Sequence, residues 1–193
     1  MITVSGYAKV LVVPDEAVLT LGIDTRDPDL AAAKKANDES MESFLQITAE
    51  KGIPEEEIVT GHLYIRPQSD VRTPRRGSRE YLVRRTVAIT LKDLSGFEEL
   101  MTAALGAGIN KVHDIEFRTS KLREHKDEAR KIALEAAREK ADAMAATLGQ
   151  SIGRPLKIRE DGSSGTSTGM DGPTPPGQIS VTAMVSVTFE MID

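Results

Sequence analysis

Between residues 179 and 191, apolar and polar side chains alternate with a period of two. All seven odd-numbered positions are apolar or small, and five of the six even-numbered positions are polar, with Met184 as the exception. A period of two places successive side chains on opposite faces of an extended chain. The pattern therefore predicts a long C-terminal β-strand, Ile179 to Met191, with one buried face.

The N-terminal part of the chain shows strand-like patterns twice. Residues 2–13 and 17–24 both carry apolar side chains at alternate positions, and Pro14 and Asp15 interrupt the pattern between them. Proline cannot donate to a strand ladder, and aspartate favours turns. Because the connection is short, we expect these two strands to form an antiparallel hairpin.

Three segments show the spacing of amphipathic helices instead: residues 27–51, 95–105 and 120–148. The last of them holds eight alanines between positions 129 and 146, and such small side chains would let it lie close to a sheet. Each segment begins at a residue whose side chain can accept hydrogen bonds from free helical amides: Asp27, Ser95 and Ser120.

Further strands are predicted at residues 58–67, 81–91, 112–119 and around 156–158, which makes the element order ββαββαβαββ. Strand pairs interrupted by helices favour an α+β fold, with an antiparallel-rich sheet and the helices packed on one face. The length of 193 residues suits one domain or two closely fused halves. We expect a single domain over residues 1–193, with flexible loops at about 68–80 and 161–178.

Composition excludes several kinds of site. The chain has no cysteine, which excludes disulfides, thiolate zinc sites, iron–sulfur clusters and a cysteine nucleophile. Aromatic residues make up 4% of the chain and the net charge is −5, so nucleic-acid binding is not expected. No apolar run approaches the roughly 18 residues of a transmembrane helix. We expect no cofactor, no metal and no transmembrane segment.

Candidate catalytic residues are few. Residues 165–169, Gly-Thr-Ser-Thr-Gly, match the pattern of a nucleophilic serine, but that motif requires a strand before it and a helix after it. Here a loop precedes a strand, so we interpret the match as accidental, and a hydrolase using Ser167 is the least favoured function. His62, His113 and His125 lack metal-ligand spacing, although a triad assembled from distant residues stays open.

A basic segment is the strongest candidate for binding. Residues 66–85 contain seven arginines against Asp70 and Glu80. The simplest interpretation is a hairpin loop kept in solvent by its charge. Alternatively the segment binds an anionic ligand or an acidic protein, or meets an acidic surface of another copy such as the glutamates at 55–57. The binding hypothesis rests on four side chains: Arg72, Arg75, Arg76 and Arg79.

One polar residue interrupts an apolar helical stripe. Asn37 lies among apolar positions of the first predicted helix, with no acid, base or nucleophile at helical spacing beside it. Buried amides normally find hydrogen-bond partners inside the fold. We therefore interpret Asn37 as a structural polar residue that joins the helix to nearby backbone.

The order of short motifs along the chain resembles that of the SIMPL-domain family, which includes bacterial periplasmic immunogenic-type proteins. The motifs that carry the resemblance are Ile-Thr-Val-Ser-Gly at 2–6, Val-Pro-Asp-Glu-Ala at 13–17, Val-Ala-Ile-Thr-Leu-Lys-Asp-Leu at 87–94, Ala-Gly-Ile-Asn at 107–110, the alanine-rich helix at 128–141 and the strand at 181–190. The resemblance covers nearly the full chain.

The resemblance implies a protein of largely unknown molecular function and brings no catalytic residues with it. It also implies export in bacteria, a link to oxidative-stress protection in some members, and homo-oligomers. We expect a periplasmic or envelope location if the chain is a processed form, and a cytoplasmic one if Met1 is the true start. The expected function is a non-enzymatic, self-assembling protein, with anion binding through residues 66–85 as the alternative.

Overall fold

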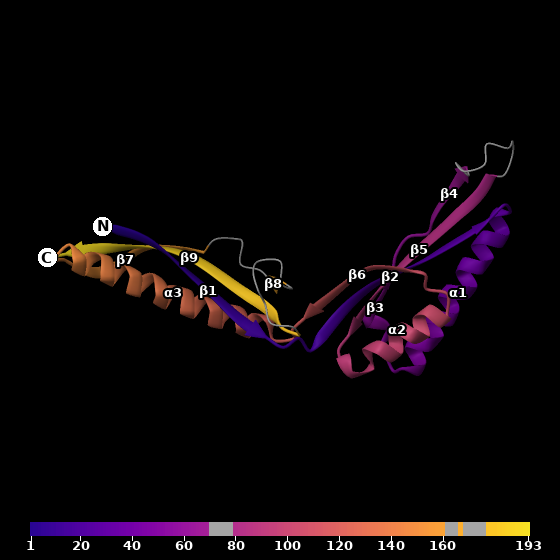
Figure 1. Cartoon of the computed structure of the whole chain (residues 1–193), viewed down its shortest axis with the longest axis horizontal. Helices are drawn as coiled ribbons and strands as arrows, with labels where there is room; N and C mark the ends of the chain where they lie inside the picture. The colour runs from indigo at the N-terminus through magenta and orange to yellow at the C-terminus, as the bar shows by residue number, and fades with distance from the viewer. Residues whose placement is uncertain (70–78, 161–165, 168–176) are drawn as a thin grey trace. The chain divides into compact units, whose positions relative to one another are not determined.

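The two ends of the chain meet in one sheet. Strand β1, Ile2–Val12, pairs antiparallel with β9, Ile179–Ile192, and Gly6 lies opposite Val185. Figure 1 shows the two as adjacent indigo and yellow arrows. The computed structural model describes residues 1–69, 79–160, 166–167 and 177–193. Its contacts divide the chain into two compact units, one of residues 15–117 and one that joins residues 1–14 to 118–193.

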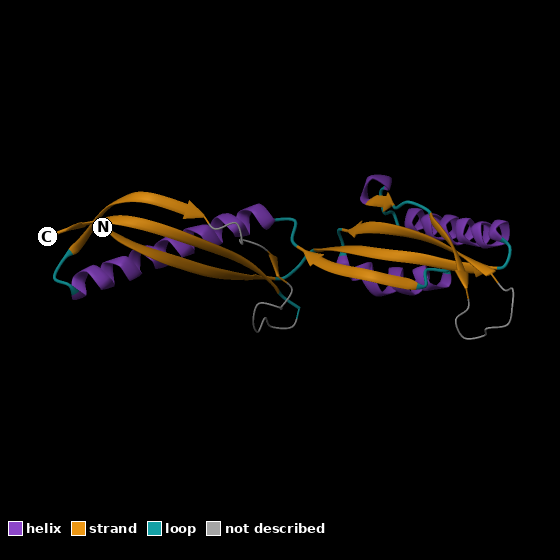
Figure 2. Ribbon diagram, turned by 90° about the horizontal axis from the view of Figure 1, so that it is seen from above, coloured by secondary structure: helices purple, strands orange, loops and turns teal. Residues whose placement is uncertain are grey.

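The unit that contains both ends is a sheet covered by one long helix. Its strand order is β1-β9-β7, where β7 is Ser151–Glu160, and the two-residue strand β8, Thr166–Ser167, also pairs with β9. Helix α3, Leu122–Thr147, packs along one face of this sheet (Figures 1 and 2). The long C-terminal strand predicted from the period of two is therefore present and lies in the middle of the sheet.

Small residues set the distance between α3 and its sheet. The helix buries an alanine at every fourth position, so that one stripe of methyl groups faces the strands. Opposite this stripe lies Gly6, where an added Cβ atom would be 1.9 Å from the carbonyl oxygen of Ala133. No side chain fits at that distance, so the contact requires glycine. The stripe consists of Ala129, Ala133, Ala137, Ala141 and Ala145.

The second unit is a sheet with two helices on its apolar side. Its strand order is β3-β5-β2-β6, and β4 also pairs with β5. Aliphatic side chains of β2 and β5 pack against both helices, around Phe44, which is fully buried. The elements are β2 Glu16–Asp27, α1 Leu30–Glu50, β3 Ile58–Thr60, β4 Tyr64–Ser69, β5 Arg79–Leu91, α2 Phe97–Gly106 and β6 Lys111–Arg118, with 3-10 turns at Glu55–Glu57 and Leu94–Gly96.

The α+β class expected from the sequence is confirmed, but the expected N-terminal hairpin is wrong. β1 pairs with β9, whereas β2 pairs antiparallel with β5 in the other sheet, where Leu21 lies opposite Val87. Pro14 and Asp15 mark the boundary between the two units. A proline between two strands shows where the first strand ends. It does not show which other strand the first one pairs with.

Smaller differences concern element boundaries. The strand expected over residues 58–67 is two strands, β3 and β4, and between them the Gly61 amide donates to the Thr86 carbonyl at 2.7 Å. Helix α1 is capped by Asp29, whose carboxylate accepts from the Ala31 amide, and not by Asp27. Asp93, ahead of the predicted Ser95 cap, accepts from the Ser95 amide.

The third predicted cap also differs. The residue before α3 is Lys121, which makes no capping bond with its side chain, whereas Ser120 was the expected cap. The loops expected at 68–80 and 161–178 fall mainly on residues 70–78, 161–165 and 168–176, which lie outside the described residues. The structure divides into two compact units. Whether they act as the single domain expected over residues 1–193 stays a prediction.

The contact at Gly6 leads to a first prediction. Gly6→Ala should lower the free energy of unfolding by about 1–3 kcal/mol or more, because the new methyl group forces α3 away from the sheet. Gly106→Ala is the matched control, since no atom lies within 4 Å of an added Cβ atom at that helical position. Urea denaturation followed by circular dichroism measures both. Equal stability of the two variants would contradict the close contact.

Candidate functional sites

The described residues do not assemble a metal centre. Among them, no group of three or more histidine, cysteine, aspartate or glutamate side chains is placed to hold an ion. His62 and His113 are exposed, and His125 Nδ1 lies 3.8 Å from Glu128 Oε2 one helical turn away. No helix in the described part of the chain is both long enough and apolar enough to cross a membrane.

The serine of the Gly-Thr-Ser-Thr-Gly match has a different context from a nucleophile elbow. Ser167 belongs to β8, where it lies opposite Ser180 of β9. A nucleophilic serine of this motif stands on a sharp turn between a strand and a helix. Gly165 and Gly169 lie outside the described residues.

The arginines of the basic segment divide into two groups. Arg84 donates from Nε and Nη2 to the two carboxylate oxygens of Asp24, at 2.7 and 2.8 Å, and Arg85 Nη2 donates to Asp38 at 2.6 Å. These two cations are therefore already compensated inside the unit. Among the proposed anion-binding residues, Arg79 begins β5, whereas Arg72, Arg75 and Arg76 lie outside the described residues. Anion binding through this segment stays a prediction.

The Asp24–Arg84 pair is anchored on the face of the sheet by a neighbouring amide. Asn110 Oδ1 accepts from the Asp24 amide at 2.9 Å, and Asn110 Nδ2 donates to the Asp24 carbonyl at 2.8 Å. The Asp24 side chain is 7% exposed. The hydrogen bonds from Arg84 hold the pKa of Asp24 below its usual value, against the opposing effect of burial, and Lys111 and Arg26 act in the same direction as Arg84.

Asn37 lies fully buried between α1 and its sheet. Its Nδ2 donates to the carbonyl oxygen of Ile23 at 3.1 Å and to that of Val83 at 3.2 Å. Ile23 belongs to β2 and Val83 to β5, so one side chain joins the helix to two neighbouring strands. Its Oδ1 has no hydrogen-bond partner among the residues that the structure describes. These contacts are those of a residue that sets the position of α1 on the sheet.

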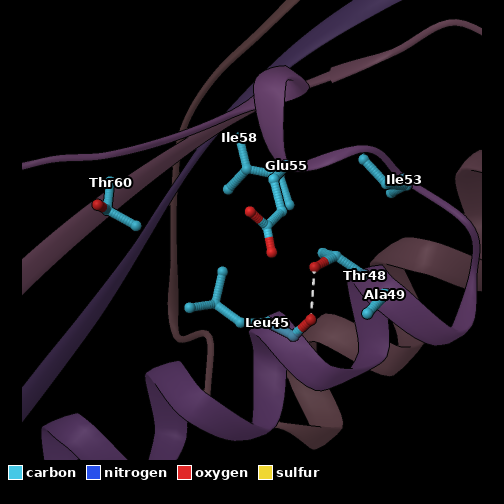
Figure 3. A pocket seen from close by; sticks show the side chains of 7 residues that line it. All are labelled: Leu45, Thr48, Ala49, Ile53, Glu55, Ile58 and Thr60. Carbon is cyan, nitrogen blue, oxygen red and sulfur yellow. Dashed lines mark hydrogen bonds between the residues drawn. The ribbon is translucent and has the colours of Figure 1, made fainter.

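A pocket of about 310 Å³ lies where the C-terminal end of α1 meets β3. Figure 3 shows Leu45 and Ile58 on opposite sides of it, with the Glu55 carboxylate directed into the space between them. The Thr48 hydroxyl also faces it but donates to the Leu45 carbonyl at 2.7 Å. Glu55 is the one ionisable side chain in the described lining, and acid–base or nucleophilic catalysis needs a paired group.

An exposed apolar cluster lies on the sheet face that α3 leaves uncovered. Tyr7 of β1 is opposite Met184 of β9, and their exposed fractions are 55% and 38%; Leu11, further along β1, is 44% exposed. We call Tyr7, Leu11 and Met184 the open-face patch. Hydroxyl residues surround it, namely Thr3, Ser5, Thr182, Ser186 and Thr188. The charged residues of this face in the described strands include Lys9, Lys157, Arg159 and Glu190.

The open-face patch was missed by the sequence interpretation, although one signal was present. Met184 is the single apolar residue among the polar positions of the last strand. A single apolar residue on the solvent face of a strand is common, and it points to an interaction surface only when other exposed apolar side chains lie beside it. Tyr7 and Leu11 are similar exceptions at odd positions of the first strand, but only the pairing of β1 with β9 places Tyr7 beside Met184.

The sequence has known relatives. The family model SIMPL, described as "Protein of unknown function (DUF541)", matches residues 2–189. The chain belongs to the SIMPL family. The resemblance inferred from the order of motifs is therefore confirmed, and the SIMPL match extends over both units.

Curated SIMPL relatives are similar over most of this chain. The uncharacterized protein YggE of Edwardsiella ictaluri is 30% identical over 162 residues, which are 82% of this chain and 66% of that protein. YggE of Escherichia coli K12 is 29% identical over 158 residues, or 82% and 64%. The 26 kDa periplasmic immunogenic protein of Brucella melitensis is 25% identical over 164 residues, or 82% and 66%. The chain thus spans just under two thirds of the length of these relatives.

The Asp24–Arg84 pair leads to a prediction about pH. Because the pKa of Asp24 is lowered in the folded state, its carboxylate stabilises the fold above the unfolded pKa of about 3.9, and this contribution is lost as pH falls through the folded value. Asp24→Asn should therefore lower the free energy of unfolding by about 1–3 kcal/mol at pH 7, and by much less near pH 3.

Urea denaturation of both proteins at the two pH values measures this difference. Asp142→Asn is the control, because Asp142 Oδ2 lies 3.9 Å from Arg138 Nε on an exposed helix surface, and its loss should change stability by less than about 0.5 kcal/mol. A difference between wild type and Asp24→Asn that is the same at pH 7 and pH 3 would show that the ion pair does not stabilise the fold.

Proposed function

We propose that this SIMPL protein is a non-enzymatic, self-assembling protein whose copies associate through the uncovered face of the β1-β9-β7 sheet. The observation that carries the proposal is the open-face patch of Tyr7, Leu11 and Met184. A sheet packed on one side by a helix can bury its other side only against another surface. Exposed apolar side chains grouped on such a face are typical of interaction sites.

The area of the uncovered sheet face is too small to form a stable interface by itself. Three strands, β1 of 11, β7 of 10 and β9 of 14 residues, present an area of roughly 500 Å², from the rise per residue and the distance between strands. A stable interface buries about 800 Å² on each partner. We therefore expect a second contact in addition to the open-face patch, or an association that is weak and depends on concentration.

The outer edge of β1 supplies that second contact in our proposal. In the described part of the chain, β1 pairs with β9 on one side and with no strand on the other. Unpaired edges add strands from other chains through main-chain hydrogen bonds. Lys140 Nζ donates to the Ser5 carbonyl at 3.0 Å, and lysines at an edge limit indiscriminate pairing. We therefore infer that the edge contributes after the faces have met.

The proposal extends two family expectations to this chain. The name of the Brucella relative states a periplasmic location, and we propose the same compartment here. We also propose a role linked to oxidative stress. A chain without cysteine is compatible with such a role, because it offers no thiol to the oxidation chemistry that inactivates many proteins.

Assembly can be tested at the open-face patch. Wild-type protein should show a mass in solution above that of one chain, rising with concentration through the micromolar range. Met184→Glu should weaken this association by about tenfold or more, because a charge would be buried between the faces. Sedimentation equilibrium at several protein and salt concentrations measures the association constant.

Met144→Glu is the matched control. Met144 is also an exposed methionine, 49% accessible, but lies on α3 and away from the uncovered face. It should leave the association unchanged. Wild-type protein that stays monomeric up to about 100 μM, a concentration at which micromolar contacts are populated, would refute the proposed function. An equal effect of both variants would place the contact elsewhere.

A further inference from the structure

A polar pocket of about 360 Å³ lies on the sheet of the other unit, and its volume is within the range of small-molecule sites. The described residues that line it are Asp24, Arg26, Asn110 and Lys111. Ile23 of β2 belongs to the core beneath the helices, and side chains alternate along a strand. Asp24 and Arg26 therefore face the side of the sheet that α1 and α2 leave uncovered.

The one acid of this pocket is already neutralised. Both carboxylate oxygens of Asp24 accept hydrogen bonds from Arg84, and the Asp24 side chain is 7% exposed. Asn110 Nδ2 donates one hydrogen to the Asp24 carbonyl. An amide nitrogen carries two hydrogens, so Asn110 has a second donor to offer a ligand. The pocket thus presents donors, with its carboxylate occupied.

Lys111 is held on the same face as Arg26. An added Cβ atom at Gly22 would lie 3.2 Å from Lys111 Cβ and 2.6 Å from His113 Nε2. The stem of Lys111 therefore lies over the position where β2 lacks a side chain. Gly22 and Arg26 are four residues apart on β2 and share one face of the strand. The Asn110 amide donates to the Gly22 carbonyl at 3.1 Å and fixes the chain there.

Arg26 and Lys111 are the uncompensated cations of the pocket. Both side chains are exposed, and neither forms an ion pair with a carboxylate in the described part of the chain. After the hydrogen bonds from Arg84, the charges of Lys111 and Arg26 also lower the pKa of Asp24, which places both cations near one carboxylate. Because Asp24 and Arg84 cancel each other, the pocket keeps the charge of two cations.

Neighbouring rows of the sheet do not remove this excess. Arg26 lies opposite Leu82 of β5, and Leu82 in turn lies opposite Arg66 of β4. The row through Arg26 therefore adds a cation. Glu80, two residues from Leu82 on the same face, lies opposite Gln68 and adds one acid. Together Arg66 and Glu80 leave the excess unchanged, and a group of cations in excess on one face attracts anions.

We propose that this pocket binds a phosphate dianion, held by Arg26 and Lys111 with the second hydrogen of Asn110 Nδ2 as a further donor. The charge of a phosphate dianion matches the two cations, and guanidinium and ammonium groups are its common protein ligands. The lining is polar throughout, so the remainder of a bound phosphate ester would be small and hydroxylated. The site lies in the unit of residues 15–117, away from the open-face patch, and does not depend on self-assembly.

sn-Glycerol 3-phosphate and inorganic phosphate are the two probes. Titration of the isotope-labelled chain with either, at constant ionic strength and followed by amide chemical shifts, should give saturable changes centred on residues 24–26 and 110–111. Glycerol, which lacks the phosphate, should give none. Tighter binding of glycerol 3-phosphate would identify a phosphate monoester as the ligand, and equal binding would identify free phosphate; both results support the proposal.

A double variant tests the two cations. Arg26→Gln combined with Lys111→Gln should weaken binding of both probes by about tenfold or more, through the loss of charge-assisted hydrogen bonds. Arg123→Gln combined with Lys131→Gln is the matched control, because it removes the same charges from exposed positions of α3 in the other unit. Its affinity should stay as in wild type. Circular dichroism verifies that both double variants are folded.

Four results would overturn the proposal. They are no saturable shift with either phosphate; the same shifts with sodium chloride at equal ionic strength; unchanged affinity in the variant of Arg26 and Lys111; and equal losses in the two double variants. Binding of a single-stranded oligonucleotide without binding of either probe would also overturn it. Because the mass of the assembly is measured separately, failure of phosphate binding leaves the self-assembly proposal unaffected.

Discussion

The pairing of β1 with β9 is the constraint on which the rest of the fold depends. It joins residues close to both ends of the chain, and the hydroxyls of Thr3 and Thr188, 185 positions apart, lie 2.9 Å from each other across it. Bringing together residues so far apart in the sequence costs conformational entropy, which the contacts between the two strands must offset. The alanine stripe of α3 packs on this pair of strands, with Ala133 against Gly6, so the core beneath the helix is complete only when both strands are in place.

The same constraint explains which parts of the fold could be predicted from the sequence. The strand over residues 179–191 and the three helices are visible because their periods are local. The partner of β1 is not local: residues 2–13 and 17–24 are adjacent in sequence, yet their strands enter different sheets. The caps were misplaced by two residues at Asp29 and Asp93, since several neighbouring side chains can each cap a helix.

The candidate sites were less predictable than the fold, for a physical reason. Charges on an amphipathic helix are normally solvated, so Arg138 is unremarkable in sequence. In the structure its Nε lies 3.9 Å from Asp142 one turn further along the same exposed helix surface, so the helix itself supplies the counter-charge. In the other unit, Arg84 belongs to the basic run of residues 66–85, yet its guanidinium is paired with the carboxylate of Asp24 on the neighbouring strand. Whether a cation is available for a ligand is decided by strand pairing, which short motifs do not encode.

Strand order also separates the surface proposed for assembly from a groove of about 370 Å³ between α3 and β7, lined by Leu134, Ile158 and Phe189. In the order β1-β9-β7, the edge proposed for assembly is β1, and the groove lies beside β7, with β9 between them. The open-face patch and the α3 side are likewise opposite faces of one sheet, because side chains alternate along each strand. An assembly built through β1 and the open-face patch would therefore leave the groove accessible on the α3 side.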